Sequence, residues 1–141
     1  MKNNMKEIIV GQKTSTKKVF CAEEVRAFAL SSQDSNPIHL DEEYASKTFF
    51  KKPIVHGMLV ASLFGGMLGS ELPGNGTIYL GQTIKFLKPN FVGEEITAII
   101  EIIDIRVDKP IYTLSTKCYN ASGDLTIDGE AVIMYKGELF K

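Results

Sequence analysis

Two residues of one short segment have side chains suited to proton transfer. Asp34 and His39 lie five residues apart, which on a continuous helix would separate them by roughly 140° around the axis. Pro37 lies between them and interrupts a helix, so both side chains can turn toward one point. A carboxylate and an imidazole around one water suit general acid–base chemistry near neutral pH. The alternative is that Asp34 caps a turn and His39 is a partly buried loop residue.

A second candidate group is the backbone of Gly57, in the sequence His56-Gly57-Met58. The first turn of a helix has unpaired N–H groups, and a residue without Cβ lets a ligand carbonyl approach them closely. Gly57 is therefore a candidate oxyanion donor, and the alternative is that it only permits tight packing against a strand. We expect His56 to have a supporting role, as a cap of the helix or behind the reacting groups.

The element that must hold this glycine is the apolar stretch Pro53 to Ser70, which contains no Asp, Glu, Lys or Arg. A membrane span is one interpretation of such a run, but its four glycines, His56 and Ser62 dilute its hydrophobicity. We expect instead a helix of about sixteen residues that is buried on most sides inside one domain. The rest of the chain must then wrap it.

The remaining pattern predicts mostly strands. A first short strand comes from Glu7 to Gly11 and Lys17 to Phe20, with polar residues between them. A helix over Ala22 to Ser31, which lacks a Ser, Thr or Asp cap, is followed by a loop and by a short helix that Asp41 caps. Alternating residues then predict four strands, at Ile78 to Phe86, Glu95 to Val107, Ile111 to Tyr119 and Leu125 to Tyr135. A turn follows the first of these strands, and hairpin turns connect the last three. The fold class is α+β, with four or five antiparallel strands curled around the long helix.

Length and composition limit the other possibilities. At 141 residues the chain is expected to form a single domain over residues 1–141. A net charge of −1 gives no overall field for nucleic acid or for an anionic membrane surface. Cys21 and Cys118 are far apart, which argues against a zinc site, and we expect both to be buried. The first residues contain no apolar export segment, so we expect a cytoplasmic protein.

Several motifs in order carry a resemblance to a known family. They are D-x-N-P-x-H-x-D at Asp34 to Asp41, PIVHGML at Pro53 to Leu59, LPG at Leu72 to Gly74 and IYLGQ at Ile78 to Gln82. In this combination the chain resembles the (R)-specific enoyl-CoA hydratases, which are MaoC-like dehydratases of the hot dog fold. The similarity runs from about residue 20 to residue 101 and weakens along the last strands.

The resemblance implies a fold, an activity and a set of site residues. The fold is a curved antiparallel sheet of about five strands around a central helix, in a homodimer or a dimer of dimers. The activity is reversible hydration of a trans-2-enoyl-CoA to the (R)-3-hydroxyacyl-CoA, without a metal or a redox cofactor. By position, Asp34 and His39 match the catalytic pair, Gly57 matches the glycine whose amide faces the thioester oxygen, and Asn36 matches a residue that fixes the loop or the ligand.

Further substrate contacts can be predicted along the central helix and among the lysines. Gly57, Ala61, Gly65 and Gly69 repeat every fourth residue, so small side chains line one face of the helix. That face either admits a neighbouring helix or leaves room for a slim acyl chain. Ala61 and Gly65 on this face join Asn36 and His56 as the candidate substrate-binding residues. The candidates for the CoA phosphates are Lys51, Lys52, Lys85 and Lys88.

Three other functions remain open at this point. One is a 3-hydroxyacyl-acyl-carrier-protein dehydratase of fatty acid synthesis, which a comparison of CoA and carrier-protein substrates would separate. Another is a non-catalytic acyl-CoA-binding protein, against which the presence of both Asp34 and His39 counts. A hot dog thioesterase is the third, and it would release a free thiol from acyl-CoA.

Overall fold

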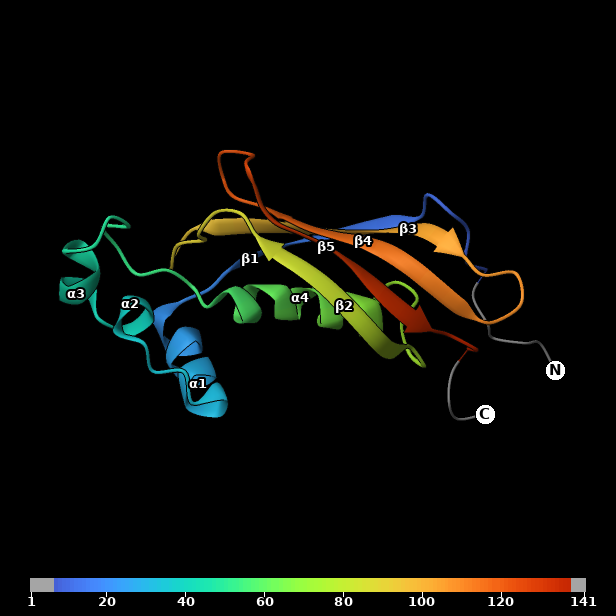
Figure 1. Cartoon of the computed structure of the whole chain (residues 1–141), viewed down its shortest axis with the longest axis horizontal. Coiled ribbons are helices and arrows are strands. Elements are labelled where there is room, and N and C mark those ends of the chain that lie inside the picture. Colours follow the sequence, from blue (N-terminus) through green and yellow to red (C-terminus); the bar gives the residue numbers. More distant parts are fainter. Residues whose placement is uncertain (1–6, 138–141) are drawn as a thin grey trace.

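The computed structural model describes residues 7–137, which form five strands and four helices (Figure 1). In chain order these are β1 (Lys13–Val19), α1 (Ala22–Ser32), α2 (Pro37–Leu40), α3 (Glu42–Ser46), α4 (Gly57–Ser70), β2 (Ile78–Phe86), β3 (Glu95–Ile105), β4 (Ile111–Tyr119) and β5 (Leu125–Met134). The strands make one antiparallel sheet in the order β1-β3-β4-β5-β2. The sheet curves over α4, while α1, α2 and α3 lie beyond the N-terminal end of that helix (Figure 1).

The contact between α4 and the sheet forms the core of the molecule. The helix buries Val60, Phe64, Met67 and Leu68 against the inward-facing residues of β3, β4 and β5. In β3 every second residue from Ile96 to Ile102 is fully buried, as expected for a strand with one face on the core. Each large aliphatic side chain buried in this way contributes about 1.5–3 kcal/mol. The predicted curled sheet along one apolar helix is confirmed. The expected burial of that helix on most sides is wrong, because Met58, Ser62, Gly66 and Gly69 on its other side are exposed.

The central helix is shorter than predicted, with 14 residues from Gly57 to Ser70. The preceding residues 53–56, which we call the connecting segment, are extended instead. Ile54 forms an isolated bridge with Phe91, and the Val55 N–H donates to the carbonyl of Asn90 at 2.8 Å. No helix within residues 7–137 is long and apolar enough to cross a membrane. The connecting segment therefore ties the beginning of α4 to the loop between β2 and β3.

Two elements differ from the prediction. The first strand lies at Lys13–Val19 and includes the polar residues that we expected to be a gap. Its side chains are exposed or half-buried because β1 is an edge strand, held by backbone pairing to β3 and not by apolar burial. The predicted loop between α1 and α3 contains a further short helix, α2. Pro37 begins it, since proline suits the first helical position, and Asn36 Oδ1 accepts a hydrogen bond from Ile38 N–H.

Both cysteines were expected to be buried, and only one of them is. Cys118 is buried in the core, where burial raises the pKa of its thiol to about 12, but Cys21 is exposed. Cys21 occupies the N-cap of α1, and its N–H donates to Glu24 Oε1 at 3.1 Å. A glutamate at the third helical position thus satisfies one of the free N–H groups at the beginning of the helix.

The outer strand β2 shows no simple alternation of buried and exposed residues. Its register against β5 shifts between Tyr79 and Gly81, so Leu80 is an extra residue that interrupts the pattern. The three apolar residues Ile78, Tyr79 and Leu80 are between 41% and 49% exposed. The alternation expected over Ile78 to Phe86 would place Ile78, Leu80 and Gln82 on one face, and the register shift shows that this expectation is wrong. Within the described residues, β2 is therefore an edge strand of the sheet that exposes apolar side chains.

Candidate active site

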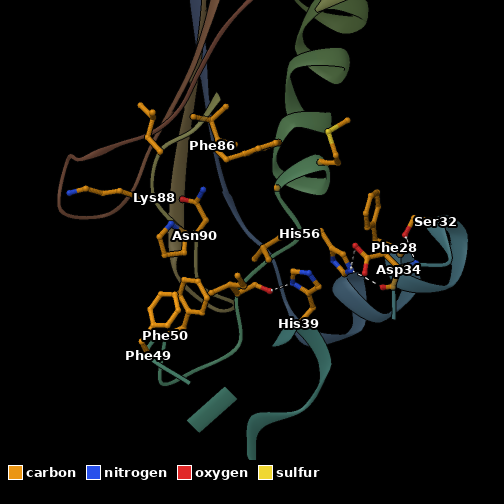
Figure 2. Close-up of a pocket in the computed structure, with 17 residues that line it drawn as sticks. Phe28, Ser32, Asp34, His39, Phe49, Phe50, His56, Phe86, Lys88 and Asn90 are labelled. Atoms are coloured by element: carbon orange, nitrogen blue, oxygen red, sulfur yellow. Dashed lines mark hydrogen bonds and ion pairs between the residues drawn. The ribbon is translucent and has the colours of Figure 1, made fainter. Parts of the chain in front are cut away.

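A pocket of about 790 Å³ lies where α1, α2, the connecting segment and the β2–β3 loop meet (Figure 2). It brings together Asp34, His39 and Gly57, which the sequence indicated as the reacting groups, and it includes His56. Most of the other lining residues are apolar or aromatic, among them Phe28, Phe49, Phe50, Ile54, Val55, Met58, Phe86, Leu87 and Ile127. A largely apolar pocket with a few convergent polar groups is typical of a small-molecule site.

Asp34 is positioned by the turn that ends α1. Gln33 adopts a left-handed conformation with φ of 64° and so terminates the helix. The Asp34 N–H donates to Ser32 Oγ at 3.2 Å, and Asp34 Oδ1 accepts from the Asn36 N–H at 3.2 Å. The carboxylate thus makes the turn contact expected of a loop aspartate, while its side chain stays 50% exposed toward the pocket.

His39 is positioned on α2 by a hydrogen bond to the connecting segment. Its Nδ1 lies 2.8 Å from the carbonyl oxygen of Ile54 (Figure 2). A carbonyl can only accept, so Nδ1 carries the proton and, in the neutral ring, Nε2 keeps its lone pair. Burial is the main cause that lowers the pKa of His39 from its ordinary value of 6.5. The nearby His56 also lowers it, while the bond to Ile54 and the carboxylate of Asp34 act in the opposite direction. His39 is therefore a neutral base at pH 7.

His56 lies behind these two residues and contacts both. Only 3% of it is exposed, its ring stacks on that of His39 with centroids 3.8 Å apart, and its Nε2 lies 3.0 Å from the backbone carbonyl of Asp34. The edge of Phe28 packs against the same ring at 4.9 Å. The side chain does not cap α4, in contrast to one of our expectations; it points to the loop after α1.

Gly57 begins α4 and faces the ring of Phe86. A Cβ at this position would lie 2.5 Å from Phe86 Cε1, so glycine is what allows the ring to pack there. As the first helical residue, Gly57 also has an N–H with no acceptor within the helix. The two interpretations of this glycine, tight packing and an accessible amide, are thus compatible.

Three acidic or imidazole groups lie close enough to suggest a metal site. One potential ligand atom from each of Asp34, His39 and His56 falls within 4.8 Å of the others. The two imidazole rings, however, stack at an interplanar angle of 24°, so their in-plane lone pairs run side by side and do not converge on one ion. His39 Nδ1 and His56 Nε2 also already donate to carbonyl oxygens. This geometry suits proton transfer better than metal coordination.

The other predicted substrate contacts are divided between several places. Ala61 and Gly65 line a second pocket of about 550 Å³ between α4 and β2, and Met58 lines both pockets. The Asn36 side chain caps α2, so it fixes the loop. Of the four candidate lysines, Lys88 lines the first pocket and pairs with Asp124 at 3.4 Å.

Several lining residues were not found from the sequence. Phe28 and Asn90 lie in segments without a motif, and Phe49 and Phe50 form a ring pair on the opposite side of the pocket from Asp34 (Figure 2). Phe49 is 84% exposed although it is aromatic. The adjacent phenylalanines between Thr48 and Lys51 were the one available signal, but a pair of aromatic residues is more often core than binding surface.

Comparison with known proteins shows the family and the fold of this chain. The model of the MaoC-like domain matches residues 5–120, which is most of the chain. The protein therefore belongs to the MaoC-like family, and it has the hot dog fold, in which a curved antiparallel sheet wraps one helix.

Two relatives and one solved structure are similar over most of their length. The chain is 55% identical over 124 residues to the (R)-specific enoyl-CoA hydratase of Aeromonas caviae, covering 88% of this chain and 92% of that protein. A solved structure of an (R)-hydratase of A. caviae superimposes with a TM-score of 0.90 at 53% identity, covering 91% of this chain and 97% of the other. The mitochondrial 3-hydroxyacyl-[acyl-carrier-protein] dehydratase of Arabidopsis thaliana is 38% identical over 125 residues, which are 86% of this chain and 74% of that protein.

The environment of His39 predicts its titration. Because burial and His56 favour the neutral ring, we expect the pKa of His39 in the folded protein to lie below 6.5. The ring then stays neutral at pH 7 and gains its proton only in more acidic solution. The chain contains two histidines, so NMR titration of the imidazole C–H signals, assigned with His39→Gln, measures this directly. A pKa at or above 6.5 would contradict the assigned environment.

Proposed function

We propose that the protein catalyses the reversible hydration of trans-2-enoyl-CoA to (R)-3-hydroxyacyl-CoA. The observation that carries this proposal is the pocket in which a neutral His39, the Asp34 carboxylate and the first-turn amide of Gly57 lie together. Similarity to (R)-specific enoyl-CoA hydratases over most of the chain supports the same reaction. No step of the proposed reaction needs a metal or a redox cofactor.

In the proposed reaction, Asp34 and His39 hold a water molecule beside C3 of the substrate. As the oxygen bonds to C3, one of the pair accepts a proton from the water, and the pair delivers that proton to C2 from the same face. The sum is addition of one water across the double bond, and the pair returns to its starting protonation state. Negative charge on the thioester oxygen is stabilised by the Gly57 amide, a type of contact worth about 3–4 kcal/mol in other enzymes.

The pair can be tested by removing each member. We expect Asp34→Asn and His39→Ala each to lower kcat for crotonyl-CoA by about 10²–10⁴-fold, since this is the usual contribution of a general acid or base. Loss of the enoyl absorbance measures the rate. Asp104→Asn is the matched control, because this aspartate is exposed on β3, away from the pocket.

Activity within about twofold of wild type in both variants would contradict the proposed roles.

The acyl-carrier-protein dehydratase is the second candidate, because the Arabidopsis enzyme of that name is 38% identical. Measuring kcat/KM for the same acyl group on CoA and on the carrier protein separates the two.

We propose Lys88 as a contact for the CoA phosphates, since it is the one of the four candidate lysines that lines the first pocket.

We further propose that the acyl chain passes from the first pocket along α4 into the second. Met58 lines both pockets and so joins them. Ala61 and Gly65 have little or no side chain, so they leave space between α4 and β2. A Cβ at Gly65 would lie 3.6 Å from the ring of Tyr79, an ordinary van der Waals contact, so a larger side chain at this position would extend into the second pocket.

Chain-length preference tests this path. We expect Gly65→Leu to lower kcat/KM for octenoyl-CoA by at least tenfold relative to crotonyl-CoA, because the new side chain fills the second pocket. Gly66→Leu is the matched control, since the next residue is exposed and its Cβ would meet open space. An unchanged ratio in Gly65→Leu would exclude the path.

We also propose that two copies associate through β2. The strand forms one edge of the sheet and exposes Ile78, Tyr79 and Leu80, which a second copy would cover. Two such dimers could pair in turn, and the mass of the protein in solution distinguishes a dimer from a dimer of dimers.

Light scattering tests this association. We expect a mass of about twice 15.6 kDa or a higher even multiple, and a shift toward the monomer in Leu80→Lys, because a charge would be buried between the strands. Leu30→Lys, at an exposed leucine of α1, controls for the added charge. A monomeric wild type would refute the proposal.

A cytoplasmic location is a further part of the proposal. The exposed free thiol of Cys21 fits a reducing compartment, which is also where acyl-CoA thioesters are made and used. Recovery of the protein from the secreted fraction of its cells would contradict it.

A further inference from the structure

We propose that His56 is a positioning residue that holds Asp34 and His39 in fixed relation to each other. This inference rests on the proposed function, because it assigns the distance between the two proton-transferring groups to a third side chain. His56 lies at the junction between the connecting segment and α4, whereas Asp34 and His39 come from the loop after α1 and from α2. It is thus the point at which the helical end of the molecule meets the core helix.

The first contact fixes the main chain of Asp34. His56 Nε2 lies 3.0 Å from the Asp34 carbonyl oxygen, and because that oxygen can only accept, Nε2 carries the proton. The same nitrogen lies 4.0 Å from Asp34 Oδ2. One buried N–H group therefore restrains the residue that bears the carboxylate and also lies beside the carboxylate.

The second contact fixes the ring of His39. The two imidazoles stack with centroids 3.8 Å apart, so His56 covers one face of the His39 ring while the bond to Ile54 holds its edge. Phe28 packs edge-on against the same His56 ring, so that His56 cannot easily tilt away. The Ile54 carbonyl and the His56 ring thus determine the plane in which the His39 lone pair lies, and Phe28 supports the His56 ring.

A purely space-filling role would not explain an imidazole at this position. Nδ1 of His56 is buried and has no hydrogen-bond partner within residues 7–137. An unpaired buried polar atom is unfavourable, and an apolar ring of the same size would fill the space without it. The donor at Nε2 is the feature that such an apolar ring would lack.

The contact also affects the protonation of His39. The groups that face its ring are His56 from the beginning of α4, Asp34 from the loop after α1 and the Ile54 carbonyl from the connecting segment. His56 acts in the same direction as burial and lowers the pKa of His39, whereas Asp34 and the Ile54 carbonyl raise it. Loss of His56 should therefore raise this pKa toward 6.5.

Two substitutions separate the two contacts. His56→Gln keeps an N–H that can reach the Asp34 carbonyl but has no ring to stack on His39. His56→Phe keeps a ring and removes the donor. Val60→Ala is the control for stability, because Val60 is fully buried in α4 and does not line the first pocket.

We expect both His56 variants to lower kcat for crotonyl-CoA by about 10–100-fold with KM within about twofold, because a small misplacement of reacting groups costs about that much in rate. The acid limb of the pH profile of kcat/KM should move to higher pH in both. In protein without a histidine tag, His56→Gln leaves His39 as the one histidine, so NMR titration also follows its pKa without any substrate.

The outcomes distinguish this inference from the proposed function. Wild-type kcat in both His56 variants would overturn it, and so would an equal loss of kcat in Val60→Ala, which would assign the effect to stability alone. If the wild-type protein does not hydrate crotonyl-CoA, the proposed function fails. In that case the NMR titration decides, and an unchanged pKa of His39 in His56→Gln and His56→Phe overturns the contact itself.

Discussion

The hydrogen bond from His39 Nδ1 to the carbonyl of Ile54 joins the two parts of the molecule on which the candidate site depends. His39 belongs to the small helices beyond the sheet, and Ile54 belongs to the connecting segment that leads into α4. The bond determines the tautomer and so leaves Nε2 as the basic atom. The backbone pair from Ile54 N–H to the Ile38 carbonyl, at 3.3 Å, strengthens the same junction. The junction thus helps to fix the distance between the imidazole and the Gly57 amide.

The core helix provides the other half of the constraint. The curved sheet buries one side of α4, through Val60, Phe64, Met67 and Leu68, and the first turn of the helix opens to the pocket. Phe86, at the end of β2, packs over Gly57, and a Cβ at that position would force the ring to move. Stability and chemistry therefore share one helix, with its middle in the core and its beginning at the site.

The strands and the core helix could be predicted because burial imposes a regular pattern on their residues. In β3, alternate burial from Ile96 to Ile102 follows directly from the sequence. β1 was misplaced because an edge strand held by backbone pairing needs no apolar residues. α2 was missed because Pro37 was interpreted as a helix breaker, although it begins the helix behind the Asn36 cap.

For the site, the motif indicated residues that the fold brings into one pocket, but it could not give their contacts. That Asp34 and His39 share a pocket was expected from the break at Pro37. That His56 stacks on His39 and binds the Asp34 backbone was not, since these residues are 17 and 22 positions away and only the folded chain brings them together. The aromatic residues that line the pocket could not be predicted either, because they come from segments far apart in sequence. They are Phe28, Phe49, Phe50 and Phe86.

The central claim is that one Asp/His pair adds water across an enoyl thioester from one face. Hydration of crotonyl-CoA in D₂O, with chiral analysis of the product, tests it most directly. The account predicts (R)-3-hydroxybutyryl-CoA with one deuterium at C2 on the same face as the new hydroxyl. An (S) product, or deuterium on the opposite face, would contradict it.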